Sequence, residues 1–136
     1  MGFADWFTIK TPAQRKKEAR MYDRWAFPYG PAQKEKLQQI IRDLMPGEDP
    51  ISGMAVFLIG REAYIGSFKA DVEELAERTE EGKLKALDYA LQGQLRGKYK
   101  KFIPYYKAMI LADANITAEL AYPSVEELKE MAEKLA

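Results

Sequence analysis

The chain has 136 residues, carries 21 Lys and Arg against 21 Asp and Glu, and is 47% hydrophobic. This length predicts one domain with one sizeable core, and the composition excludes a disordered chain, which could not bury enough apolar surface. The chain has no cysteine and no histidine, so disulfides, Ser-His-Asp and Cys-His catalytic groups and Cys/His zinc sites are excluded within it.

The chain begins with an aromatic-rich segment, residues 1–10, which we expect to dock on the core or on a partner. Thr11 followed by Pro12 has the form of a helix N-cap and first helical position. No helix breaker follows before Pro28. The sequence therefore predicts a first helix over residues 12–26.

A proline-marked turn separates this helix from the next. Residues 27–31 hold two prolines and one glycine, which predicts a turn, and Pro31 opens a second helix that runs to about Met45. Four aliphatic residues of this helix recur at three- and four-residue spacing and predict one buried stripe: Leu37, Ile40, Ile41 and Leu44.

The third element is ambiguous between helix and strand. Residues 46–50 predict another turn, in which Asp49 before Pro50 again has the form of a cap followed by a proline. The apolar residues of 51–68 fit a buried strand as well as a buried helix. We favour the helix, because one isolated hairpin among helices would leave sheet edges to cover, and we keep a hairpin at about residues 54–68 as the alternative.

The middle of the chain predicts two helices. Asp71, with Glu74 three residues on, resembles a capping box and starts a fourth helix. The aliphatic residues early in this region face a different direction from the later ones, so one straight helix could not bury both sets well. We therefore predict a kink or break near residues 81–82 and a fifth helix over about residues 83–96, ended by Gly97.

The C-terminal third predicts two more helices. Pro104 suits the first turn of a sixth helix that ends near Asn115, a residue that tolerates the left-handed cap position. Its predicted inward-facing residues are Tyr106, Met109 and Ile110. After a loop over residues 117–123, Ser124 and Glu127 have the spacing of a capping box and start the last helix. Its predicted buried residues are Val125, Leu128, Met131 and Leu135.

Together these elements predict a single mainly α domain over residues 1–136. We expect an irregular bundle of roughly five to seven helices joined by Pro/Gly turns, with the small hairpin as the alternative for one element. No stretch approaches the roughly 18–20 apolar residues that span a bilayer, and the N-terminus lacks the features of a secretory signal. With the absence of cysteine, these features lead us to expect a cytoplasmic protein without a membrane partner.

Charge is distributed unevenly along the chain. Residues 83–107 hold seven Lys and Arg against one Asp, a net charge of +6, whereas residues 61–82 hold three Lys and Arg against seven Asp and Glu, a net charge of −4. Residues 96–107 interleave cations with aromatic rings, a combination suited to phosphate contacts and base stacking on single-stranded nucleic acid. The candidate nucleic-acid contacts are Arg96, Lys98, Tyr99, Lys100, Lys101 and Phe102. The alternative is that the rings pack in the core while the lysines solvate a connecting loop.

A second candidate surface is the aromatic run over residues 22–29, around the first proline turn. Tryptophan and tyrosine are enriched among the residues that dominate protein–protein binding energies. The candidate interaction residues are Trp25, Phe27 and Tyr29. The alternative is that these rings fill the corner between two helices.

No residue pattern points to an enzyme or to a cofactor. The chain has no Walker loop, no Gly-x-Gly-x-x-Gly, no EF-hand loop and no Gly-x-Ser-x-Gly, so we predict no cofactor, no metal and no catalytic residue. The function that we favour is a small non-enzymatic cytoplasmic protein-interaction domain, self-association included. The alternatives are a nucleic-acid-binding module that uses residues 96–107 and an enzyme that works without histidine or cysteine. The sequence does not indicate whether a small molecule binds.

Overall fold

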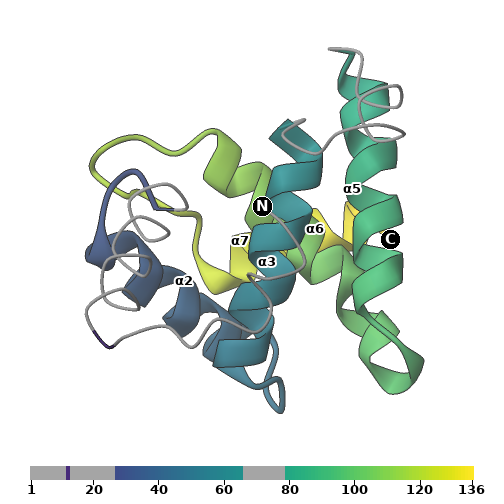
Figure 1. Cartoon of the computed structure of the whole chain (residues 1–136), viewed down its shortest axis with the longest axis horizontal. Helices are drawn as coiled ribbons and strands as arrows, with labels where there is room; N and C mark the ends of the chain where they lie inside the picture. The colour runs from purple at the N-terminus through teal and green to yellow at the C-terminus, as the bar shows by residue number, and fades with distance from the viewer. Residues whose placement is uncertain (1–11, 13–26, 66–78) are drawn as a thin grey trace. The chain divides into compact units, whose positions relative to one another are not determined.

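Helices supply the regular structure of the protein. The computed structural model describes Pro12, residues 27–65 and residues 79–136 (Figure 1). Within these residues the chain forms five α-helices and one 3-10 helix and has no strand. The predicted mainly α class is therefore confirmed.

The chain divides into two compact units, residues 1–34 and residues 35–136. The single domain predicted for the whole chain stays a prediction. The N-terminal segment expected to dock, residues 1–10, lies outside the described residues. The same holds for the predicted first helix apart from Pro12 and for the predicted helix start at Asp71.

The first described helix, α2 (Pro31–Leu44), begins where the sequence predicts. In the turn before it, the backbone carbonyl of Phe27 accepts a hydrogen bond from the N–H of Gly30 at 2.8 Å. Gly30 has a φ of +86°, a conformation that residues with a Cβ atom rarely adopt. Of the predicted stripe, Ile40 is half-buried and the other three residues are buried: Leu37, Ile41 and Leu44.

The ambiguous segment is a helix, α3 (Pro50–Ile65). The hairpin alternative is wrong for residues 54–65, which are all helical. Asp49 caps this helix, because its carboxylate accepts hydrogen bonds from the backbone N–H groups of Ile51 at 3.4 Å and Ser52 at 3.2 Å. The cap predicted from the Asp-Pro pair is confirmed.

The next described helix, α5 (Glu80–Gln94), starts and ends earlier than the predicted residues 83–96. The kink or break predicted near residues 81–82 lies slightly earlier, because Thr79 is extended and the new helix begins at Glu80 and runs through residues 81–82. Thr79 caps the helix, and its hydroxyl oxygen accepts a hydrogen bond from the N–H of Gly82 at 3.0 Å. Gly82 therefore lies in the first turn of a helix and does not interrupt one.

Two consecutive helices follow α5. Gly97 has a φ of +58° and begins the 3-10 helix η2 (Gly97–Phe102), and α6 (Ile103–Ala114) continues directly from it with a proline in its first turn, as predicted. The predicted inward-facing residues of α6 are all buried: Tyr106, Met109 and Ile110. Asn115 has a φ of −109°, so it does not take the left-handed conformation expected there. Leu120 in the following loop does, with a φ of +56°.

The last helix, α7 (Val125–Leu135), begins with the predicted capping box. The Ser124 hydroxyl accepts a hydrogen bond from the N–H of Glu127 at 3.2 Å, and the Glu127 carboxylate accepts one from the N–H of Ser124 at 3.5 Å. Of its predicted inward residues, Leu128 is fully buried. The others are half-buried: Val125, Met131 and Leu135.

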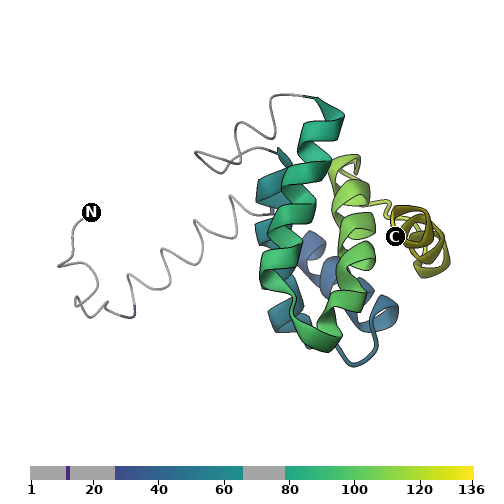
Figure 2. The same cartoon turned by 90° about the vertical axis from the view of Figure 1, so that its right-hand side faces the viewer.

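Three helices of the unit formed by residues 35–136 pack against one another: α3, α5 and α6. Figures 1 and 2 show them side by side. α7 packs on α6 and crosses it, so that Figure 2 views α7 end-on. Because α3 has a neighbour on more than one side, its buried residues point in several directions and lack a helical period. This is why its sequence fits a buried strand as well as a helix.

A glycine allows α3 to approach these neighbours closely. A Cβ atom added at Gly60 would lie near three side-chain carbons: Ile110 Cδ1 at 2.6 Å, Leu91 Cδ2 at 3.1 Å and Leu87 Cδ1 at 3.2 Å. These three side chains are fully buried. A close-packed interior leaves them little space to move into, so the junction of the helices requires a residue without a side chain.

We expect Gly60→Ala to lower the free energy of unfolding by about 1–3 kcal/mol, because the added methyl group overpacks this junction. Gly93→Ala is the matched control, since Gly93 is exposed on α5 and a Cβ atom there would meet nothing within 4 Å. The control should be neutral or stabilise by up to about 1 kcal/mol. Urea denaturation followed by circular dichroism measures both variants, and equal stabilities would contradict the packing described.

Candidate functional site

Four exposed cations lie on or beside η2. Arg96 precedes the helix, and three lysines lie on it: Lys98, Lys100 and Lys101. Within the described residues, none of the four makes an ion pair. Lys107, by contrast, is paired, because its Nζ lies 2.6 Å from Asp88 Oδ1. We call Arg96, Lys98, Lys100 and Lys101 the basic surface.

Aromatic rings form a row along η2 and the start of α6. Because a 3-10 helix has about three residues per turn, residues three apart lie on one side. The ring centroids of Tyr99 and Phe102 are 6.4 Å apart, and those of Phe102 and Tyr105 are 6.3 Å apart. Phe102 is 6% exposed and Tyr99 is 40% exposed. Phe102 therefore anchors η2, and Tyr99 is the predicted contact ring that reaches solvent.

Two lysines of the basic surface lie over rings of this row. Lys98 Nζ is 5.3 Å from the centroid of Tyr99, and Lys101 Nζ is 5.2 Å from the centroid of Phe102. Both distances fall within the range of a cation–π contact, which at an exposed site contributes about 0.5–1 kcal/mol. Such a contact orients an ammonium group and leaves its charge uncompensated.

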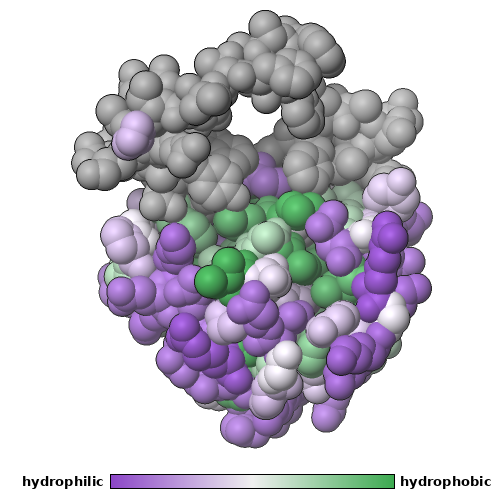
Figure 3. Space-filling view, turned by 60° about the horizontal axis from the view of Figure 1, so that its bottom comes forward, coloured by the Kyte–Doolittle hydropathy of each residue, from purple (hydrophilic) through white to green (hydrophobic). Residues whose placement is uncertain are grey.

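A cleft of about 540 Å³ lies beside the basic surface. One wall comes from the α2–α3 connection and the start of α3, and the other from the end of α5 and from η2. These segments lie at the same end of the α3, α5 and α6 group in Figures 1 and 2. On the face that Figure 3 brings forward, hydrophobic residues gather near the middle, and hydrophilic residues lie beside and below them. The charged, apolar and aromatic residues that line the cleft are Glu48, Asp49, Val56, Leu95, Arg96 and Tyr99.

Hydrogen bonds hold the two carboxyl groups of the cleft. Glu48 Oε2 accepts a hydrogen bond from the Tyr106 hydroxyl at 3.0 Å, and Glu48 Oε1 accepts one from the N–H of Asp49 at 3.1 Å. Tyr106 is fully buried, and this burial, followed by the charge of Glu48, raises the pKa of its hydroxyl. The Ser52 hydroxyl donates to Asp49 Oδ2 at 2.8 Å and lowers the pKa of that carboxyl. Neither carboxyl group was among the residues predicted for a site.

The aromatic residues predicted around the first turn are only partly accessible. Trp25 lies outside the described residues. Phe27 is 3% exposed, so its ring does not reach the surface, whereas Tyr29 is 40% exposed. In its described part, this run therefore presents one ring to solvent, that of Tyr29.

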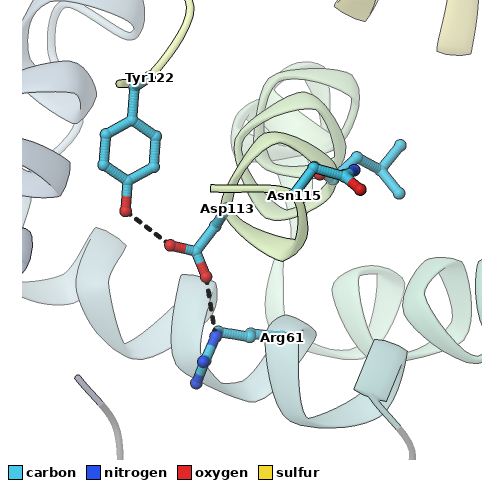
Figure 4. Close-up of polar contacts among 5 residues, drawn as sticks. Arg61, Asp113, Asn115 and Tyr122 are labelled. Atoms are coloured by element: carbon cyan, nitrogen blue, oxygen red, sulfur yellow. Dashed lines mark hydrogen bonds and ion pairs between the residues drawn. The ribbon is translucent and has the colours of Figure 1, made fainter. Parts of the chain in front are cut away.

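A buried ionic contact links α3, α6 and the loop before α7. Asp113, whose side chain is 1% exposed, lies between Arg61 and Tyr122 (Figure 4). Arg61 Nε donates to Asp113 Oδ2 at 2.9 Å, and the Tyr122 hydroxyl donates to Asp113 Oδ1 at 2.6 Å. The three residues belong to no sequence motif, so no local pattern could have predicted that they lie in contact. Since the Asp113 side chain is shielded from solvent, we assign this contact to holding the loop and not to binding.

Comparison of the chain with protein-family models, with curated proteins and with solved structures found no match. The site is therefore interpreted from its own residues. In the described part of the chain, no group of three or more carboxylate, histidine or cysteine side chains is placed to hold a metal ion. Among the described helices, none is long and apolar enough to cross a membrane.

We expect Tyr106→Phe to lower the free energy of unfolding by about 1–2 kcal/mol, because it removes a buried hydrogen bond to a carboxylate and keeps the ring. Tyr89→Phe is the matched control, since Tyr89 is 71% exposed on α5, and it should have no measurable effect. Urea denaturation at neutral pH gives both free energies. If the two variants proved equally stable, the bond to Glu48 would not hold the α2–α3 connection in place.

Proposed function

We propose that this protein is a non-enzymatic protein-interaction domain whose basic surface binds an acidic segment of a partner protein. One observation carries the proposal: the four exposed cations within residues 96–101 have no ion-pair partner among the described residues. Like charges at this spacing repel one another. An acidic partner relieves that repulsion and associates faster through electrostatic steering.

The surroundings of the basic surface favour a protein over a nucleic acid. Single-stranded nucleic acid is held by exposed rings on which successive bases stack, but in the aromatic row Phe102 is buried and Tyr105 is half-buried. Glu48 and Asp49 line the same cleft as Arg96, and carboxylates repel phosphate groups. A polypeptide supplies acidic residues for the cations and other residues for the cleft.

Nucleic acid is the second candidate partner, because the cations of the basic surface suit phosphate groups as well as carboxylates. The two candidates differ in their salt dependence. Phosphate binding releases condensed counterions, so affinity for nucleic acid falls steeply and linearly on a logarithmic scale as salt rises. Binding of a short acidic segment that also packs in the cleft depends less on salt.

Acid–base catalysis needs a pKa near neutrality, and four described residues have pKa values shifted by their surroundings. Burial and the hydrogen bond to Glu80 raise the pKa of Tyr64 to about 12, and burial also raises the pKa of Tyr106. Side-chain hydrogen bonds lower the pKa values of Asp49 and Glu119. Each of these shifts moves the group away from neutrality.

The test removes three charges from the basic surface with Lys98→Gln, Lys100→Gln and Lys101→Gln in one variant. Wild type and variant serve as bait in nuclease-treated lysate of the source cell, and retained proteins are quantified by mass spectrometry. We expect the variant to retain the partner roughly tenfold less, because it loses three exposed ion pairs of about 0.5 kcal/mol each.

The matched control removes three exposed cations elsewhere on the protein: Arg42→Gln, Lys129→Gln and Lys134→Gln. This control should retain the partner as the wild type does, and circular dichroism should show that all three proteins fold alike. Equal loss of the partner from both variants would show that net charge alone decides retention and would contradict the proposal. Retention that is seen in a parallel untreated lysate and lost in the nuclease-treated one would favour the second candidate.

A further inference from the structure

The cleft beside the basic surface has walls of opposite charge. Glu48 and Asp49 stand on the wall formed by the α2–α3 connection, and Arg96 stands on the wall formed after α5. Across the cleft, within the described residues, neither carboxyl group forms an ion pair with Arg96. Both kinds of charge are therefore available to a ligand.

Apolar and aromatic side chains also line the cleft. Val56 and Leu95 line the cleft together with the ring of Tyr99. The volume of about 540 Å³ falls within the range of about 300–1,000 Å³ that is typical of ligand pockets, and the cleft is partly open to solvent. The cleft can accommodate an apolar side chain together with parts of the residues on either side of it.

The acidic wall is fixed before a ligand arrives. The buried Tyr106 hydroxyl holds Glu48, and the Ser52 hydroxyl holds Asp49. Groups that are already oriented lose little conformational entropy on binding. A ligand cation therefore meets a pre-organised pair of carboxyl groups.

We propose that the cleft recognises the charge order of the partner segment: a basic residue, then an apolar residue, then acidic residues. The basic residue pairs with Glu48 and Asp49. The apolar side chain packs on Val56 and the ring of Tyr99, and the acidic residues reach the cations of the basic surface. This inference rests on the proposed function, and it adds that the partner segment carries both charges in a defined order instead of acidic residues alone.

Three short synthetic peptides test the charge order by fluorescence anisotropy with the full-length protein. The first carries arginine, then phenylalanine, then three acidic residues, with glycine spacers. The second has the same composition but places the arginine among the acidic residues, and the third replaces the arginine by glutamine. We expect the first peptide to bind about two- to fivefold more tightly than the second, because only the first presents its cation to the acidic wall.

Asp49→Asn tests the wall itself, because asparagine removes the charge and still caps a helix. This substitution should lower the affinity for the first peptide about two- to fivefold. The affinity for the third peptide should stay unchanged or increase, since that peptide has no cation for the wall. Asp43→Asn is the matched control, as Asp43 is exposed on α2 outside the cleft, and it should change neither affinity. The proposal would be overturned if the wild type bound the first and second peptides with equal affinity. It would also be overturned if Asp49→Asn lowered the affinities for the first and third peptides equally.

The third peptide separates this proposal from the proposed function. If it binds through Lys98, Lys100 and Lys101 while the first peptide binds no better than the second, the proposed function stands and the charge-order inference fails. If substitution of these lysines changes the affinity of none of the peptides, both fail.

Discussion

The geometry of the cleft depends on one buried hydroxyl group, that of Tyr106, and on the acceptor of its hydrogen bond. The residue is fully buried, and a buried hydroxyl without a hydrogen bond would destabilise the folded state by about 1–3 kcal/mol. Gly53 leaves room for it, because a Cβ atom there would lie 2.8 Å from the hydroxyl oxygen. Glu48 supplies the acceptor at 3.0 Å. This bond ties the α2–α3 connection to α6.

The same hydrogen bond connects the acidic wall of the cleft to the part of the chain that carries the basic surface. Tyr106 lies in α6, which continues directly from η2, so the residue that holds Glu48 follows closely after the cations. Phe102 is buried and anchors η2, and the pair formed by Lys107 and Asp88 joins α6 to α5. Packed rings and a paired neighbour thus hold the segment, while the charges of the basic surface itself stay unpaired among the described residues.

Local signals predicted the helices that begin at a clear cap. Ser124 starts α7 as its sequence indicates, because a capping hydrogen bond spans only three residues. Contacts between distant residues could not be predicted in this way: Glu48 and Tyr106 are 58 residues apart and share no motif. The sequence shows that residues 96–107 combine cations with aromatic rings, but only the packed structure shows that Phe102 is buried. The sequence places the break near Gly82 instead of at Thr79, because glycine is the stronger local signal and the capping contact of Thr79 is visible only in the structure.

The basic surface and the acidic wall are proposed to form one binding surface, and an NMR titration can observe both of them at once. The peptide with arginine, phenylalanine and three acidic residues is added to ¹⁵N-labelled protein, and the amide chemical shifts are followed to saturation. Binding to this single surface should cause the largest changes in two separate stretches, residues 96–101 and residues 47–52. Changes confined to one stretch, or largest on α7, would contradict it.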